Sequence, residues 1–100
     1  MKETIFHPEA REEIREARGF YEAHLEGLGL RFLEAVEGAA ERISADPEAG
    51  SPLAGGFRKR RISAFPCNII CRVRDDRIYF VAAAHHHRRP GYWRGRAARQ

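Results

Sequence analysis

The two runs of residues around Asp75-Asp76 constrain the fold of this chain more than any other feature of the sequence. A short turn between two runs rich in apolar and β-branched residues is typical of a β-hairpin, and it predicts strands over 68–74 and 77–85. This register pairs apolar or small residues on one face of the hairpin: Val73 with Ile78, Cys71 with Phe80 and Ile69 with Ala82. A slip of one residue would place three arginines in the core, so we predict this register.

The opposite face of the predicted hairpin has a different character. It is expected to be basic and exposed, with aromatic and histidine side chains among the charges. Its predicted members are Ile70, Arg72, Arg74, Arg77, Tyr79, Val81 and His85.

Apolar residues recur every three or four positions in two stretches of the first half, which predicts two amphipathic helices. The first stretch begins at Pro8 and has the stripe Ala10, Ile14, Ala17, Tyr21, Leu25 and Leu28. The second ends at Asp46-Pro47 and has the stripe Leu30, Leu33, Val36, Ala40 and Ile43. Because only a short joint with Gly27 and Gly29 separates them, the two helices are expected to form an antiparallel hairpin.

The remaining segments complete an α+β fold. Residues 3–7 predict a short first strand, residues 47–56 a loop, and residues 57–63 a basic strand that precedes the hairpin. The expected order is strand, helix, helix and then an antiparallel three-stranded meander, with the helices on the apolar face of the sheet. The first strand is expected to join the same sheet, at either edge. A chain of 100 residues predicts one domain over 1–100.

Charge divides the chain into two halves. Residues 1–50 hold 6 Lys and Arg against 12 Asp and Glu, whereas residues 51–100 hold 12 against 2, which gives the net charge of +4. This asymmetry favours an anionic partner for the second half, although a solvated face that only keeps the protein soluble is the alternative. No stretch approaches the ~20 apolar residues of a membrane span, and the charged N-terminus is unlike a signal peptide, so we expect a cytoplasmic protein without a membrane partner.

The two cysteines, Cys67 and Cys71, lie four residues apart in the predicted strand. In a strand their α-carbons would be ~13 Å apart, which exceeds the ~7 Å limit for a disulfide. We therefore predict that both are reduced residues of the core.

The segment 85–96, with the sequence HHHRRPGYWRGR, is the most distinctive one. If the strand continues, His85 and His87 share a face with Arg72 and Tyr79, and these groups suit a phosphodiester. The histidines can instead bond the backbone, or bind a metal, but no nearby acid or cysteine completes a ligand set, so we expect no metal site. Trp93 is better explained as an apolar plug over the sheet, whereas Tyr92 suits a plug and a base-stacking role equally.

The run Arg58-Lys59-Arg60-Arg61 is a second candidate binding site. Side chains alternate between faces on a strand, so at most two of the four can contact one phosphate track. A charged edge strand that prevents sheet-to-sheet association is the alternative explanation.

In its order of elements the chain resembles the RelE/ParE superfamily of bacterial toxins over nearly all of its length. The markers are His7-Pro8-Glu9-Ala10 at the first helix, the 21–32 stretch with its two glycines, Arg61, Phe65-Pro66 before an Ile-rich strand, and the ending 85–96 with Pro90-Gly91-Tyr92-Trp93. The resemblance implies the toxin of a type II toxin–antitoxin system, without a cofactor. It also implies a cognate antitoxin, and we expect an acidic or amphipathic antitoxin segment on the basic sheet or beside the helices.

The resemblance implies two different targets, depending on the branch. RelE-type members cut messenger RNA on the ribosome with basic residues and a late Tyr or His, whereas ParE-type members poison DNA gyrase. The strand position where RelE-type nucleases commonly carry an aromatic–Arg pair is occupied here by Cys67 and Asn68, so the phosphate-binding Arg is missing. Arg61 or Arg72 are possible substitutes. We therefore expect a ParE-like gyrase inhibitor, with a ribosome-dependent endoribonuclease or a non-catalytic nucleic-acid-binding module as alternatives.

The candidate site residues follow from these two possibilities. For a nuclease, the expected catalytic residues are Arg72, His85, His87, Arg88 and Tyr92. The residues expected to contact a nucleic acid or another target are Arg58, Lys59, Arg60, Arg61, Arg74, Arg94 and Arg96.

Overall fold

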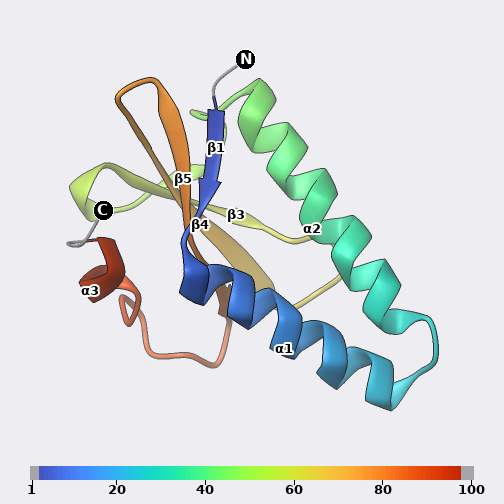
Figure 1. Cartoon of the computed structure of the whole chain (residues 1–100). Coiled ribbons are helices and arrows are strands. Elements are labelled where there is room, and N and C mark those ends of the chain that lie inside the picture. The colour runs from blue at the N-terminus through green and yellow to red at the C-terminus, as the bar shows by residue number, and fades with distance from the viewer. Residues whose placement is uncertain (1–2, 98–100) are drawn as a thin grey trace.

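A computed structural model describes residues 3–97 and has a strand, a helical hairpin and a meander in chain order (Figure 1). Its elements are β1 (Glu3–Phe6), α1 (Pro8–His24), α2 (Leu28–Ala45), β2 (Ser51–Pro52), a 3-10 turn (Ala54–Gly56), β3 (Phe57–Arg61), β4 (Cys67–Arg74), β5 (Arg77–His85) and α3 (Arg94–Ala97). The predicted α+β fold is confirmed.

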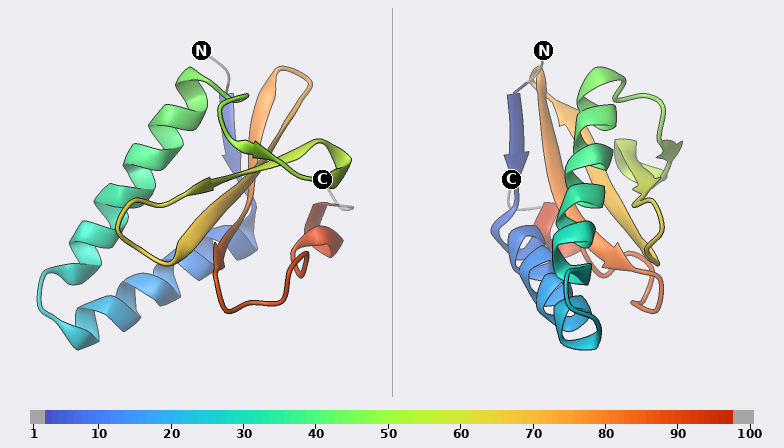
Figure 2. Two further views of the ribbon diagram at one scale, coloured as in Figure 1. Left: turned by 180° about the vertical axis from the view of Figure 1, so that it is seen from behind. Right: turned by 90° about the vertical axis from the view of Figure 1, so that its right-hand side faces the viewer.

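The strands form one sheet in the order β1-β5-β4-β3-β2. β1 runs parallel to β5, and every other pair is antiparallel. The first strand therefore joins the same sheet, as predicted, at the edge next to β5. Seen from behind, in the left view of Figure 2, the sheet lies in front of the helical hairpin, which covers its other face.

The start of α1 follows directly from its sequence. Pro8 occupies the first turn, where a missing N–H costs nothing, and the Nδ1 atom of His7 accepts a hydrogen bond from the Glu9 N–H at 3.1 Å. The first four residues of the predicted stripe, Ala10 to Tyr21, face the core or its margin. Leu25 does not, because the helix ends at His24 and leaves its side chain 56 % exposed.

The stripe of α2 agrees with the predicted one at Val36 and Ile43 and differs from it at the start of the helix. Its buried residues are Gly29, Phe32, Val36, Ala39 and Ile43, whereas Leu30 is 60 % exposed. Both stripes satisfy helical spacing, so the sequence pattern alone does not distinguish them. Aromatic packing favours the observed one, because the Phe32 ring lies between those of Tyr21 and Phe65, with centroids 5.2 and 5.1 Å away.

Gly29 is where the two helices approach each other closely. A Cβ atom there would lie 2.9 Å from the Arg18 carbonyl oxygen and 2.9 Å from Oε1 of Glu22. The Glu22 carboxylate accepts hydrogen bonds from the N–H groups of Gly27 and Gly29, which lowers the pKa of Glu22 and caps the start of α2. The tight joint therefore depends on a residue without a side chain at position 29.

This contact gives a matched pair of glycine substitutions. Gly29→Ala is expected to lower the free energy of unfolding by about 1–3 kcal/mol, because helix backbone must move. Gly19→Ala places its new methyl group in open space on α1, and it is expected to raise stability by about 0.5–1 kcal/mol through higher helix propensity. Urea denaturation of the two variants measures the difference, and equal effects would contradict the close approach at Gly29.

The β4–β5 hairpin has the predicted turn and only part of the predicted register. Asp75 and Asp76 both have positive φ, 51° and 63°, as a tight hairpin turn requires. Val73 pairs with Ile78 and Cys71 with Phe80, which confirms two of the three pairs. The third is wrong: a shift between Ile70 and Cys71 leaves Val81 without a partner, so Ile69 pairs with Ala83 and Ile70 with Ala82.

The face away from the helices contains a second apolar cluster. Phe57, Ile70, Val81, Ala82 and Trp93 are all buried in it. The prediction of a basic, exposed face is therefore wrong for Ile70 and Val81, because the segment after β5 folds back over them. The bulge also brings Ala82 to this face beside Val81, so two adjacent β5 residues contribute to the cluster.

Both cysteines are free and buried, as predicted. Burial raises the pKa of the Cys71 thiol to about 11. This thiol is therefore protonated and unreactive near neutral pH.

Candidate functional site

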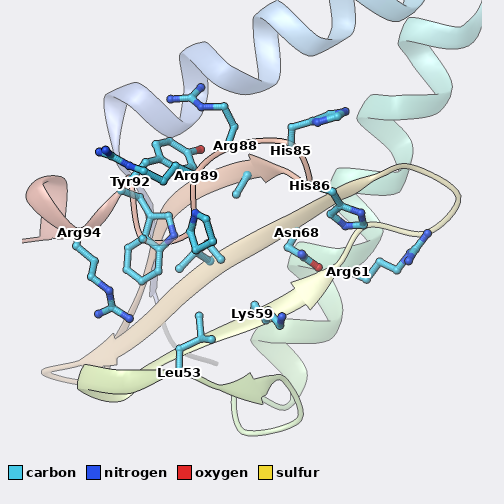
Figure 3. Close-up of a pocket in the computed structure, with 15 residues that line it drawn as sticks. Leu53, Lys59, Arg61, Asn68, His85, His86, Arg88, Arg89, Tyr92 and Arg94 are labelled. Atoms are coloured by element: carbon cyan, nitrogen blue, oxygen red, sulfur yellow. The ribbon is translucent and has the colours of Figure 1, made fainter.

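A cavity of about 690 Å³ lies between β3, β4 and the segment that follows β5 (Figure 3). Lys59 and Arg61 reach it from β3, Asn68 from β4 and His85 from the end of β5. The rest of its wall comes from Leu53, Ile70, Ala84, His86, Arg88, Arg89, Pro90, Gly91, Tyr92, Trp93 and Arg94. The distinctive C-terminal segment of the sequence thus forms one side of the largest cavity described for the chain.

Backbone hydrogen bonds and one buried aromatic ring hold this segment in place. The His86 N–H donates to the Pro66 carbonyl at 2.9 Å, and Gly91 has the positive φ of 76° that lets the chain turn back. Trp93 is 4 % exposed, and its ring packs edge-to-face on Phe57 at 4.7 Å. The prediction that Trp93 is an apolar plug is confirmed.

Glu13 of α1 ties the segment to the helical hairpin. Its carboxylate accepts hydrogen bonds from the Tyr92 hydroxyl at 2.5 Å, from the Arg96 guanidinium at 2.8 and 2.9 Å, and from the Ala83 N–H at 3.1 Å. Arg88 lies 3.9 Å from the same carboxylate. The charge of Glu13 is thus balanced by arginines that are distant in the sequence.

Sequence reasoning missed Glu13. The signal available in the sequence was the position of Glu13, which lies next to the stripe residue Ile14 and four residues after Glu9. In the structure Glu9 also pairs with Arg96, at 2.9 Å. A carboxylate on the margin of a buried stripe needs a cation, and the cations lie in the C-terminal segment.

The hydrogen bond to Glu13 determines what Tyr92 can do. Burial and the bond to the carboxylate raise the pKa of the Tyr92 phenol well above its usual range. The hydroxyl therefore keeps its proton near neutral pH and donates it to Glu13. Two guanidinium groups also lie over its ring, that of Arg88 at 4.0 Å and that of Arg96 at 5.1 Å from the ring centroid.

The five residues expected to act in a nuclease are divided between two places. His85, Arg88 and Tyr92 line the cavity. The His87 ring packs against that of His85 at 4.8 Å. Arg72 lies elsewhere. On β4, the residue opposite His85 is Cys67, whereas Arg72 is opposite Tyr79. Arg72 is therefore five residues along β4 from the level of His85, which corresponds to ~16 Å. Arg72 packs instead on the Phe57 ring at 4.5 Å.

The residues expected to contact a target are also divided. Lys59, Arg61 and Arg94 line the cavity, and Arg60 lines a second cavity beside it. Arg58 donates to the carbonyls of Glu48 and Gly50 at 2.9 and 2.7 Å, so it holds the loop after α2. Arg74 is exposed near the hairpin turn. Arg96 is buried, 8 % exposed, in its ion pairs with α1.

His85, which lines the cavity, favours its neutral form near pH 7. Burial and the neighbouring imidazoles of His87 and His86 lower the pKa of His85 below its ordinary value. Among residues 3–97, no group of three or more His, Cys, Asp and Glu side chains is arranged to hold a metal ion. Over the same residues, no helix is both long enough and apolar enough to cross a bilayer.

Comparison with known proteins identifies the family. The family described as the ParE toxin of type II toxin-antitoxin system, parDE, matches residues 4–90. A solved structure titled "Chromosomal ParDE TA system from P. aeruginosa" has the same fold, with a TM-score of 0.65 and 21 % identity over 85 % of this chain and 96 % of that chain. No curated protein matches. The chain therefore belongs to the ParE toxin family and is the toxin of a type II toxin–antitoxin system.

Proposed function

We propose that this toxin inhibits DNA gyrase and that a cognate antitoxin neutralises it. Membership of the ParE family supports this target. The second half of the chain has 12 Lys and Arg and only 2 acidic residues. This positive charge suits the binding of an acidic or amphipathic segment of the antitoxin. The proposal needs no chemistry at the cavity, because such an inhibitor acts by binding.

The hydrogen bond from the Tyr92 hydroxyl to Glu13 is the observation that favours an inhibitor over a nuclease. A phenol that acts as a general base must lose its proton, but the bond to Glu13 keeps it on the oxygen. Arg72 is also too far along β4 to contact the same phosphate as His85. The separation of Arg72 from the other groups expected for RNA cleavage supports an inhibitor that acts through contacts.

A supercoiling assay with purified gyrase tests the proposal. Micromolar toxin is expected to reduce supercoiling or to accumulate cleaved plasmid, and prior mixing with the antitoxin is expected to restore activity. Relaxation of the same plasmid by an unrelated topoisomerase serves as the control and should not change.

Toe-printing on programmed ribosomes tests the nuclease alternative in parallel. Intact message together with inhibited gyrase supports the proposal. Message cleavage that is lost in Tyr92→Phe, with unaffected gyrase, would overturn it. The arrangement of His85, Arg88 and Tyr92 around one cavity is the reason for this second arm.

A further inference from the structure

Cationic side chains continue from the large cavity around the edge of the sheet. A second cavity, of about 460 Å³, adjoins the first and shares Lys59 and Arg61 with it. We use the term cationic band for the six cations that line one or both cavities and lie outside the contacts of Glu13: Arg42, Lys59, Arg60, Arg61, Arg89 and Arg94.

The band has no acidic counterpart in the described part of the chain. Among residues 3–97, no carboxylate lines either cavity, and no ion pair joins a carboxylate to a member of the band. Glu13, which accepts the Tyr92 hydroxyl, is itself paired with Arg96 and Arg88. Like charges held together in a concavity repel one another and concentrate a positive potential, which an anion relieves.

The shape of the band favours a chain of anions over a single one. β2 pairs with β3 only at Arg58 and Lys59, so the outer edge of β3 has no neighbouring strand at Arg60 and Arg61. Side chains alternate along a strand, so Lys59 and Arg61 face one way and Arg60 the other. Charges therefore continue across the open edge from one cavity to the next, and Figure 3 shows Lys59 and Arg61 at the start of this path, with Arg94 on the far side of the cavity.

The composition of the band favours phosphate over a peptide carboxylate. Five of its six members are Arg, whose fork binds phosphate oxygens in pairs. Protein interfaces usually need an apolar anchor, but the large exposed apolar side chains, Phe20, Leu25, Leu30 and Val73, all lie outside the band. Nucleic-acid interfaces are the more polar and more positively charged kind.

The aromatic residues show how such a strand would be bound. Trp93 is buried, and the ring of Tyr92 already packs against the guanidinium groups of Arg88 and Arg96, so stacking of bases on these two rings is disfavoured. Recognition would then depend on the backbone and tolerate any sequence. We propose that the cationic band binds the phosphodiester backbone of a single nucleic-acid strand, without cleaving it, in addition to the proposed action on gyrase.

Fluorescence anisotropy with labelled dT12 and U12 tests this proposal on the purified chain. For single strands, log affinity falls with log salt by about 0.7 per phosphate contact, so about four contacts predict a loss of about 50-fold between 50 and 200 mM salt. Arg61→Gln and Arg89→Gln should each reduce the salt slope by about 0.7 on both strands. Arg31→Gln, an exposed Arg of α2 outside the band, is the matched control and should leave the slope unchanged.

Each outcome of this experiment decides for or against the band. Binding to both strands, or to one of them, with the expected variant effects supports it and tells whether DNA or RNA is preferred. No binding at 50 mM salt overturns it, as does an equal loss in Arg31→Gln, which would indicate net charge alone. Binding of a poly-glutamate peptide through the same arginines, without binding of either strand, would assign the band to an acidic protein segment. Cleavage of U12 on a gel would also contradict the proposal.

The proposed function does not depend on this result. A toxin that inhibits gyrase but binds neither oligonucleotide would overturn the cationic band alone. Circular dichroism of the two band variants and of Arg31→Gln verifies that each is folded before binding is measured.

Discussion

Replacing Glu13 by Ala is expected to lower the free energy of unfolding by about 3–5 kcal/mol. The substitution removes the carboxylate that holds the Arg96 guanidinium, and the side chains of the pair are only 10 % and 13 % exposed. The hydrogen bonds that Arg96 donates to Glu13 raise the pKa of Arg96. Because an arginine keeps its proton at neutral pH even without such a partner, the cation stays charged when Glu13 is lost. Glu9, with a side chain 53 % exposed, would remain as a partly solvated partner.

Glu12→Ala is the matched control for this substitution. It removes the neighbouring carboxylate of the same helix, which forms an exposed pair with Arg15 at 3.0 Å. Exposed pairs of this kind contribute little, and a change below about 0.5 kcal/mol is expected. Urea denaturation at pH 7 measures both variants. Equal destabilisation would show that the Glu13 network does not hold the C-terminal segment to α1.

Replacing Trp93 by Ala is the other change with a large expected effect, about 3–5 kcal/mol. Trp93 fills the second apolar cluster, in contact with the Phe57 ring and beneath the guanidinium of Arg94 at 4.6 Å. The cavity left behind would also remove the support of the segment after β5. Because Trp93 is the single Trp of the chain, unfolding must be followed by circular dichroism rather than by intrinsic fluorescence.

Limited trypsin digestion distinguishes loss of this segment from general unfolding. In Trp93→Ala, cleavage after Arg88 is expected to accelerate more than cleavage within α2. Phe20→Ala is the control, since that ring is 58 % exposed and belongs to neither apolar cluster. If both variants show the same stability and the same digestion pattern, Trp93 does not act as the plug of the second cluster.

Local patterns in the sequence were sufficient for the elements and for much of their pairing. The Pro8 start of α1, the Asp75-Asp76 turn and the pairs of Val73 and Cys71 depend on residues close together in the chain. Helical spacing alone did not select between the stripes of Leu30 and Phe32, because both repeat every three or four residues. The bulge after Ile70 left no sequence signal and changed the pairing beyond it.

Contacts between distant residues account for what sequence reasoning missed at the site. Glu13 meets Tyr92 and Arg96 across separations of 79 and 83 residues. No spacing rule connects such positions, since the two partners meet only after the sheet and the helical hairpin have packed together. Arg72 on β4 and His85 on β5 were predicted on one face, but they lie toward opposite ends of the hairpin.

The amino-acid sequence by itself determined the order of the elements, the turn of the hairpin, the acidic and basic halves and the family. These properties depend on local backbone preferences and on composition, which a linear pattern records directly. The tertiary structure alone decided which cationic side chains are buried in ion pairs and which line a cavity without acidic residues. Arg96 and Lys59 look alike in the sequence, yet one is buried against Glu13 and the other lines an acid-free cavity. The difference arises because a charge can be buried only with a partner, and the partner's position is a property of the packed molecule.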